Sequence, residues 1–154
     1  MDEMSGLRPE VEIDIKLAEI WSEVAKLNSK LDSVKGSLHR VLGLRQVRIG
    51  RSYGYPLTLG TAVAQVEEKL PSMSEWAAKD ALEMLDEVQD IKDAITAKRT
   101  EAQPLEAEFD AKQWSRFFLV NNTNGHIHSS MNCSTCHITT SFGWLPELSG
   151  LSER

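Results

Sequence analysis

The sequence is poor in aromatic residues, in cysteine and in long apolar runs. Aromatics make up 6% of its 154 residues, which is little for a compact core and favours an elongated helical body. No stretch approaches the roughly 18 consecutive apolar residues of a membrane-spanning helix, and the acidic opening MDEMSGLRPEVEID lacks the pattern of a secretory signal. We therefore expect a cytoplasmic protein without membrane contact, in which the two cysteines are a metal pair or free thiols rather than a disulfide.

Positive charge is scarce as well. The formal net charge is −6, and residues 61–113 hold 13 acidic against 6 basic side chains. Because a surface that binds phosphates needs clustered cations, this balance argues against a general affinity for nucleic acid. The one basic segment, 45–60, carries three arginines and no acidic residue. The acidic side chains of 61–113 face solvent in the simplest interpretation and meet a basic partner in the alternative.

What the sequence does contain is a regular apolar seam near its N-terminus. Between residues 13 and 41 the apolar positions are spaced alternately by four and three, which is typical of a helix that packs on another helix as in a coiled coil. Pro9 and Gly43 suit the start and the end of this helix, which we predict over residues 11–42. The seam consists of Ile13, Leu17, Ile20, Val24, Leu27, Leu31, Val34, Leu38 and Val41.

A second seam predicts a second long helix over residues 73–103. Ser72 to Glu75 suit a capping box, in which a serine hydroxyl and a glutamate carboxylate satisfy free amides. Pro104 is expected to kink or end the helix because it lacks an amide hydrogen. Two such helices form an antiparallel hairpin, and self-association through the same seams, giving a homodimer, is the alternative. The second seam comprises Ala77, Ala81, Met84, Val88, Ile91 and Ile95 and recovers at Ala102, Leu105 and Phe109.

The connection between the helices, about residues 44–71, is predicted to be an irregular tip. Glycines and Pro56 interrupt it, and only 61–70 suits a short helix. The tip combines charge with aromatic area on a segment without a heptad role, which makes it the first candidate for contact with a partner. The alternatives are a solvated tip, or arginines that only neutralise the acidic second helix. The candidate partner-binding residues are Arg45, Arg48, Arg51, Tyr53 and Tyr55.

Both cysteines and three of the four histidines fall within GHIHSSMNCSTCH, residues 125–137. Residues 116–120 are strand-like, the Asn-Gly pair before His126 favours a hairpin turn, and 126–128 return in extended spacing. Histidines two apart in a strand share a face, and cysteines with a two-residue gap reach one ion from a knuckle turn. Two nitrogens and two thiolates suit tetrahedral zinc. We therefore predict a zinc site formed by His126, His128, Cys133 and Cys136.

Other interpretations of this cluster stay open. Cys-Ser-Thr-Cys-His, 133–137, matches the c-type haem attachment pattern, but that attachment belongs to exported proteins. A thioredoxin-like redox pair needs a βαβ setting, which the pattern does not offer. Surface thiols beside unrelated histidines are the third alternative, and His137 either replaces an upstream histidine or faces solvent.

The patterns together predict a mainly α fold. Residues 1–113 form a long, coiled-coil-like antiparallel helical hairpin in this prediction. Residues 114–154 form a small C-terminal module, made of a β-hairpin and a zinc knuckle.

Segments at both ends resemble a family of proteins encoded by actinobacteriophages and their actinobacterial hosts. They are RPEVEIDIKLAEI near the N-terminus, and WSRFFLVNNTNGHIHSSMNCSTC with TTSFGWLPELSGLSE near the C-terminus. The resemblance is most specific from residue 114 to 150, and it implies a phage or host cytoplasm rather than an activity. Family members continue past the Leu-Ser-Gly segment into a second Cys-x-x-Cys, which these 154 residues do not contain. With four cysteines, Cys133 and Cys136 would be half of a four-thiolate site, and the histidines would be free.

The function expected from the sequence is that of a non-enzymatic, zinc-binding interaction protein that acts on a host cytoplasmic protein. A closed four-ligand zinc site has no open position for a substrate, and the sequence shows no Gly-rich phosphate loop and no nucleophile with a neighbouring base.

A transcription regulator is one alternative, because a helical hairpin with a Cys-x-x-Cys module resembles in architecture the regulators that enter the secondary channel of bacterial RNA polymerase. The tips of those regulators are acidic, however, whereas this one is basic. A zinc enzyme is the other, with His126, His128 and one cysteine as ligands, but residues 114–146 hold no acidic side chain and Glu147 is the nearest base.

Overall fold

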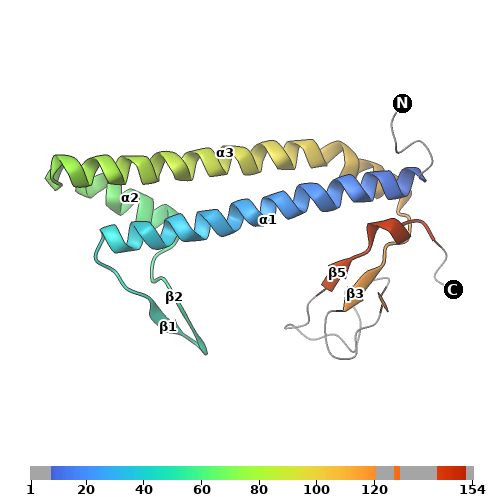
Figure 1. The fold of residues 1–154 in the computed structure, drawn as a ribbon, viewed down its shortest axis with the longest axis horizontal. Coiled ribbons are helices and arrows are strands. Elements are labelled where there is room, and N and C mark those ends of the chain that lie inside the picture. The colour runs from blue at the N-terminus through green and yellow to red at the C-terminus, as the bar shows by residue number, and fades with distance from the viewer. Residues whose placement is uncertain (1–7, 121–126, 129–141, 152–154) are drawn as a thin grey trace. The chain divides into compact units, whose positions relative to one another are not determined.

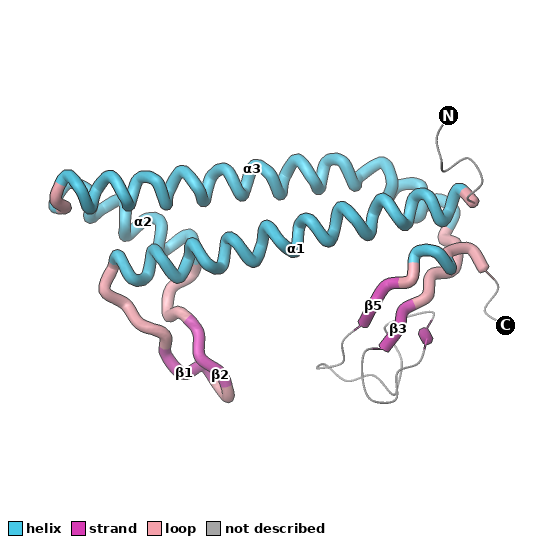
Figure 2. Tube along the Cα trace, in the orientation of Figure 1, coloured by secondary structure: helices cyan, strands magenta, loops and turns pink. Residues whose placement is uncertain are grey.

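The computed structural model describes residues 8–120, 127–128 and 142–151. These ranges are mainly helical and add two small antiparallel sheets, as Figure 1 and Figure 2 show. No helix within them combines the length and the apolar character that crossing a bilayer requires. The elements in chain order are α1 (Pro9–Val41), β1 (Val47–Ile49), β2 (Ser52–Gly54), α2 (Leu59–Lys69), the 3-10 turn η1 (Leu70–Ser72), α3 (Glu75–Lys112), β3 (Phe118–Val120), β4 (Ile127–His128), β5 (Phe142–Trp144) and the 3-10 turn η2 (Pro146–Leu148).

The chain divides into two compact units. Residues 24–97 form one, which we call the central unit, and residues 1–23 with 98–154 form the other, the terminal unit. Both α1 and α3 contribute a segment to each unit. The mainly α prediction and its two long helices are confirmed, since α1 and α3 match the helices predicted over 11–42 and 73–103. The domains predicted at 1–113 and 114–154 stay a prediction.

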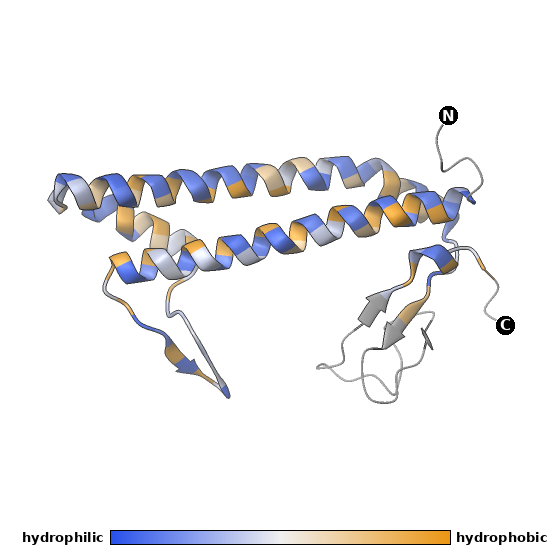
Figure 3. Ribbon diagram, in the orientation of Figure 1, coloured by the Kyte–Doolittle hydropathy of each residue, from blue (hydrophilic) through white to orange (hydrophobic). Residues whose placement is uncertain are grey.

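The core of the central unit follows the predicted seams. Apolar positions recur along both long helices between hydrophilic ones (Figure 3), and most of the buried apolar residues on these helices are seam positions. The short helix predicted at 61–70 is confirmed as α2, whose first turn is capped by the Thr58 hydroxyl accepting from the amide of Thr61 at 3.3 Å. Leu27 and Leu31 are only half-buried. The buried apolar residues of this unit are Val24, Val34, Leu38, Leu42, Ala62, Val66, Ala81, Val88, Ile91 and Ile95.

The C-terminus of α1 is closed by Gly43, as predicted. Gly43 has φ +71°, a left-handed conformation that glycine adopts without steric cost. Its amide donates to the carbonyl of Arg40 at 3.0 Å, and the amide of Leu44 donates to the carbonyl of His39 at 2.8 Å. This pair of bonds is the Schellman motif, which satisfies helix carbonyls that would otherwise lack a donor and turns the chain out of the helix axis.

Two predictions at the ends of α3 are wrong. The N-terminal cap is Ser74 rather than Ser72, because Ser74 Oγ accepts from the amide of Ala77 at 3.2 Å, while Ser72 belongs to η1 and donates to the carbonyl of Lys69. The helix also continues past its predicted end at residue 103 to Lys112, with Pro104 inside it. Tertiary contacts hold the turns beyond the proline: Trp21 Nε1 donates to Glu106 Oε1 at 3.1 Å. Packing of this kind outweighs the one backbone bond that proline removes.

The terminal unit carries a sheet in which β3 lies between β4 and β5, antiparallel to both. Phe118 is opposite His128 on one side and Trp144 on the other. Antiparallel pairing of β3 with β4 is compatible with the predicted return of the chain, and the C-terminal module as a whole stays a prediction. The strand β5 is not part of the sequence prediction.

Candidate functional site

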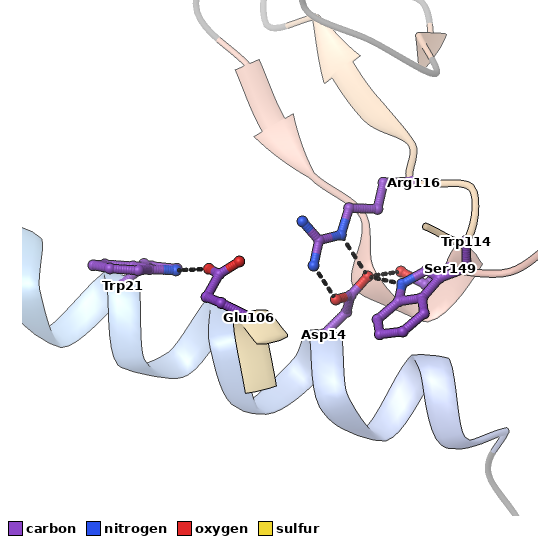
Figure 4. A network of polar contacts seen from close by, with 6 residues as sticks. All are labelled: Asp14, Trp21, Glu106, Trp114, Arg116 and Ser149. Atoms are coloured by element: carbon purple, nitrogen blue, oxygen red, sulfur yellow. Dashed lines mark hydrogen bonds and ion pairs between the residues drawn. The ribbon is translucent and has the colours of Figure 1, made fainter. Parts of the chain in front are cut away.

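The terminal unit is organised around the buried carboxylate of Asp14, on the first turns of α1 (Figure 4). Asp14 Oδ2 accepts from Trp114 Nε1 at 2.8 Å and from Arg116 Nε at 3.1 Å, and Oδ1 accepts from Arg116 Nη2 at 2.8 Å. The hydroxyl of Ser149 donates to Oδ2 as well. Four hydrogen bonds to a fully buried carboxylate match the rule that a buried charge is stable only when it is paired and hydrogen-bonded.

The guanidinium of Arg116 is held on a second side by aromatic rings. Its carbon lies 3.5 Å from the centre of the Phe109 ring and 5.0 Å from that of Trp144. Phe109 and Trp114 pack edge to face at 5.1 Å. A planar cation that pairs with a carboxylate in two-pronged fashion and stacks on aromatic faces uses both properties that distinguish arginine from lysine.

Backbone bonds complete this attachment of the C-terminal segment. The amide of Gly150 donates to the carbonyl of Ser115 at 2.8 Å, and the amide of Leu145 donates to that of Phe117 at 2.9 Å. The network thus joins residues of RPEVEID, WSRFF and the Leu-Ser-Gly segment, which lie far apart in the sequence. A fully buried carboxylate with four donors has the pattern of an anchor rather than of a catalytic base, which needs access to its substrate.

The predicted zinc ligands lie almost wholly beyond what this structure describes. His126, Cys133, Cys136 and also His137 fall outside the described residues, and His128 is described only by its backbone in β4. Within the described ranges, no three His, Cys, Asp or Glu side chains gather where they could hold one ion. The zinc site therefore stays a prediction from the sequence.

The predicted partner-binding residues belong to the central unit, where β1 and β2 form a two-stranded hairpin. Val47 pairs with Gly54, Arg48 with Tyr53 and Ile49 with Ser52. The two loop residues between the strands are Gly50 and Arg51, and Gly50 has φ +62° while Arg51 is not left-handed. Glycine at the first of two loop positions is typical of a tight hairpin turn whose twist suits the strands. Alternation along the strands puts Val47 and Ile49 on one face and Arg48 with Tyr53 on the other.

The base of this hairpin is fixed by His39, a fully buried residue of α1. His39 Nδ1 lies 2.8 Å from the carbonyl oxygen of Lys35, and Nε2 lies 3.1 Å from the amide nitrogen of Leu57. Since the carbonyl needs a donor and the amide needs an acceptor, the ring is neutral with its hydrogen on Nδ1. The ring of Tyr55 packs on the imidazole with centres 4.6 Å apart. A Cβ added to Gly36 would lie 2.7 Å from the Tyr55 hydroxyl, so the tyrosine is seated where only glycine leaves room.

The rest of the hairpin is exposed on both faces. Tyr53 is 69% exposed and Ile49 is 55% exposed. The three candidate arginines are exposed and form no ion pair with any residue in the described ranges; Arg48 Nε donates only to the nearby carbonyl of Gly50, at 3.2 Å. Four of the five predicted contact residues therefore share an open segment, and Tyr55 is the exception because it packs inward on His39.

A second exposed surface of the central unit was not predicted from the sequence. At the start of α3, Trp76 is 76% exposed and Leu82 is 50% exposed. They flank the seam positions Ala77 and Ala81 rather than belonging to the seam. An off-seam tryptophan in a helix of otherwise charged outer positions is the signal that could have identified this surface. We call it the Trp76 face; the residues that line its hollow include Glu75, Trp76, Lys79, Leu82, Glu83 and Asp86.

The hairpin strands also carried a signal in the sequence. Val-Arg-Ile-Gly-Arg-Ser-Tyr-Gly alternates apolar with polar residues around a Gly-x pair, which is typical of a hairpin with a two-residue loop. No family model, no curated protein and no solved structure matches this chain.

Proposed function

We propose that this chain is a non-enzymatic interaction protein whose β1–β2 hairpin contacts a protein partner. The observation that carries the proposal is the contrast between the base and the end of the hairpin. The base is fixed by His39 through Tyr55 and Leu57, whereas the end presents arginine, tyrosine and aliphatic side chains to solvent. Arginine and tyrosine are enriched where interfaces are buried, because each combines contact area with hydrogen bonding.

The physical chemistry of small sheets supports this assignment. A two-stranded hairpin is marginally stable in water unless one of its faces is covered. Here Val47 and Ile49 on one face and Tyr53 on the other are all exposed. A partner that covers one face would remove apolar area from water, which stabilises the complex by about 25 cal/mol for each Å² buried. The hairpin is thus presented by the fold without being used for its core.

The proposal includes a structural zinc ion bound by His126, His128, Cys133 and Cys136. It is supported by the spacing of these residues in the sequence and by the extended backbone at Ile127–His128. A closed tetrahedral site contributes folding energy and leaves no position for an activated water. The partner is expected to be a cytoplasmic protein of the host, as the family resemblance implies.

Capture from host lysate with a charge-reversed hairpin tests the contact. The full chain carrying Arg45→Glu, Arg48→Glu and Arg51→Glu should recover at least about tenfold less partner than the unchanged chain, because reversed charges repel a complementary surface. The matched control reverses Lys30, Lys69 and Lys92, which are also exposed and also lie in the central unit. It should capture normally. Equal capture by both triple variants, with unchanged thermal midpoints, would remove the hairpin from the interface.

A further inference from the structure

The Trp76 face combines exposed apolar side chains with acidic ones, as surfaces that bind a partner do. Trp76 and Leu82 offer large apolar surfaces on a helix whose apolar seam lies elsewhere. The same hollow is lined by Glu75, Glu83 and Asp86, with Lys79 as its one basic residue. Tryptophan at the centre of an exposed patch with charged neighbours is typical of an interface hot spot.

The hairpin has the complementary composition. Residues 45–56 contain three arginines and no acidic residue, and Val47 and Ile49 expose apolar area beside them. Arginine side chains can pair with the carboxylates of the Trp76 face and can also stack on the indole ring. The basic hairpin and the mainly acidic Trp76 face are therefore complementary in charge, and both expose apolar area.

Neither surface is covered by any residue in the described part of the chain. All residues of the central unit, 24–97, are described, and both the end of the hairpin and the Trp76 face are exposed there. Figure 1 shows the hairpin extending away from the helix from which it emerges. We infer that the Trp76 face receives the β1–β2 hairpin of a second copy of this chain. This inference rests on the proposed function, because the same hairpin is the contact element.

The geometry of such an assembly follows from its two unlike surfaces. Each copy has one hairpin and one Trp76 face. When the hairpin of the first copy binds the Trp76 face of the second, the Trp76 face of the first and the hairpin of the second remain free. If both contacts form between the same two copies, the dimer closes; if they do not, copies add head to tail. A closed dimer buries the contact twice, whereas an open pair leaves one hairpin free to contact another protein.

Sedimentation of the full chain at low salt tests the inference. The expected result is a mass of twice 17.2 kDa, or higher multiples if the contacts stay open, with dissociation as salt rises, because exposed charge pairs are screened. A mass of 17.2 kDa at every concentration up to about 100 μM would overturn the inference. It would leave the proposed function standing, since capture of another protein by the hairpin is measured separately.

Charge exchange between the surfaces identifies the contact. Arg48→Glu with Arg51→Glu, and separately Glu83→Arg with Asp86→Arg, should each weaken association by at least about tenfold. Combining all four changes in one chain should restore it, because the pairs are then reversed in sign.

Trp76→Ser should weaken association to a similar extent, and at a concentration at which the chain is monomeric it should not lower the thermal midpoint, since the side chain is 76% exposed. Lys30→Glu with Lys92→Glu is the control and should leave association unchanged. Association that persists through both charge-reversed pairs, or that is lost without recovery in the fourfold variant, would assign it to another surface and overturn the inference.

Discussion

The Nε2 atom of His39 accepts a hydrogen bond from the backbone amide of Leu57, 18 residues further along the chain, at 3.1 Å. This bond fixes the second arm of the hairpin to the side of α1. His39→Phe keeps a ring to pack on Tyr55 but leaves the amide of Leu57 without an acceptor. We predict a loss of about 1 to 3 kcal/mol in the free energy of unfolding, measured in urea. Tyr53→Phe, at an exposed position, should change stability by less than about 0.5 kcal/mol, and equal stability of both variants would show that His39 does not anchor the hairpin.

The pairing of Asp14 with Arg116 predicts that replacing the Asp14 carboxylate by an amide strongly lowers the free energy of unfolding. Asp14→Asn removes the charge that compensates a guanidinium whose side chain is 17% exposed. The expected cost is about 3 to 5 kcal/mol, because one partner of a buried pair is left uncompensated. The control is Glu101→Gln: its pair with Lys98 spans 3.6 Å and the glutamate is 60% exposed, so about 0.5 kcal/mol or less should be lost. Similar thermal midpoints for the two variants would refute the anchoring role of Asp14.

The seam of the central unit predicts a contrast between two leucines. Leu38 is fully buried, whereas Leu82 is 50% exposed. Leu38→Ala should lower the free energy of unfolding by about 2 to 5 kcal/mol through lost burial and a residual cavity. Leu82→Ala removes the same atoms and should change it by less than about 0.5 kcal/mol. The prediction fails if the two substitutions cost the same.

Two glycines of the central unit, one in the hairpin loop and one in α2, are expected to respond in opposite ways to substitution by alanine. Gly50 has φ +62° and nothing within 4 Å of an added Cβ, so Gly50→Ala imposes a left-handed conformation on alanine, at about 1 to 2 kcal/mol. Gly60 lies in α2 with open space around it and no positive φ. Gly60→Ala should stabilise by about 0.4 to 1 kcal/mol. Hydrogen exchange of the amides at 47–54 measures the first effect, which should appear as faster exchange there; unchanged exchange would contradict the turn geometry.

The zinc prediction is tested by metal analysis of the purified full chain. One zinc per chain is expected, and Cys133→Ser should release it, because serine is a poor ligand for this ion. Cys133→Ser should also lower the thermal midpoint, since metal binding contributes to folding. A metal-free chain with an unchanged midpoint would exclude the site, and retention of zinc by a His126→Ala, His128→Ala double variant would point to other ligands.

Much of the helical architecture could be predicted from the sequence because its signals are local and periodic. The alternating seam spacing identifies α1 from Ile13 to Val41, and Gly43 ends it through its left-handed conformation. The zone around Leu27 is less buried than the seam pattern alone indicates. The capping-box pattern favours Ser72, because Glu75 follows it by three residues, but Ser72 belongs to the 3-10 turn over Leu70–Ser72 and the cap of α3 is Ser74.

The tertiary features could not be predicted in the same way. The contact of Asp14 with Arg116 spans 102 residues, and no periodicity marks a single carboxylate within an apolar turn as buried. The burial of His39 could not be predicted from local sequence either, because its hydrogen-bond partner Leu57 is 18 residues further along the chain. The arginines of the tip were recognised from composition, whereas Tyr55 could not be separated from Tyr53 before the strand pairing and the ring contact with His39 were known.

The central claim, that the hairpin is a contact element, is tested most directly by site-specific photocrosslinking. A photoreactive phenylalanine analogue replaces Tyr53, which is 69% exposed at the hairpin, and in a control chain it replaces Asp32, which is exposed on α1. In host lysate, position 53 should yield one dominant crosslinked protein, either another protein or a second copy of this chain, and position 32 should not. The same weak set of products from both positions would contradict the account.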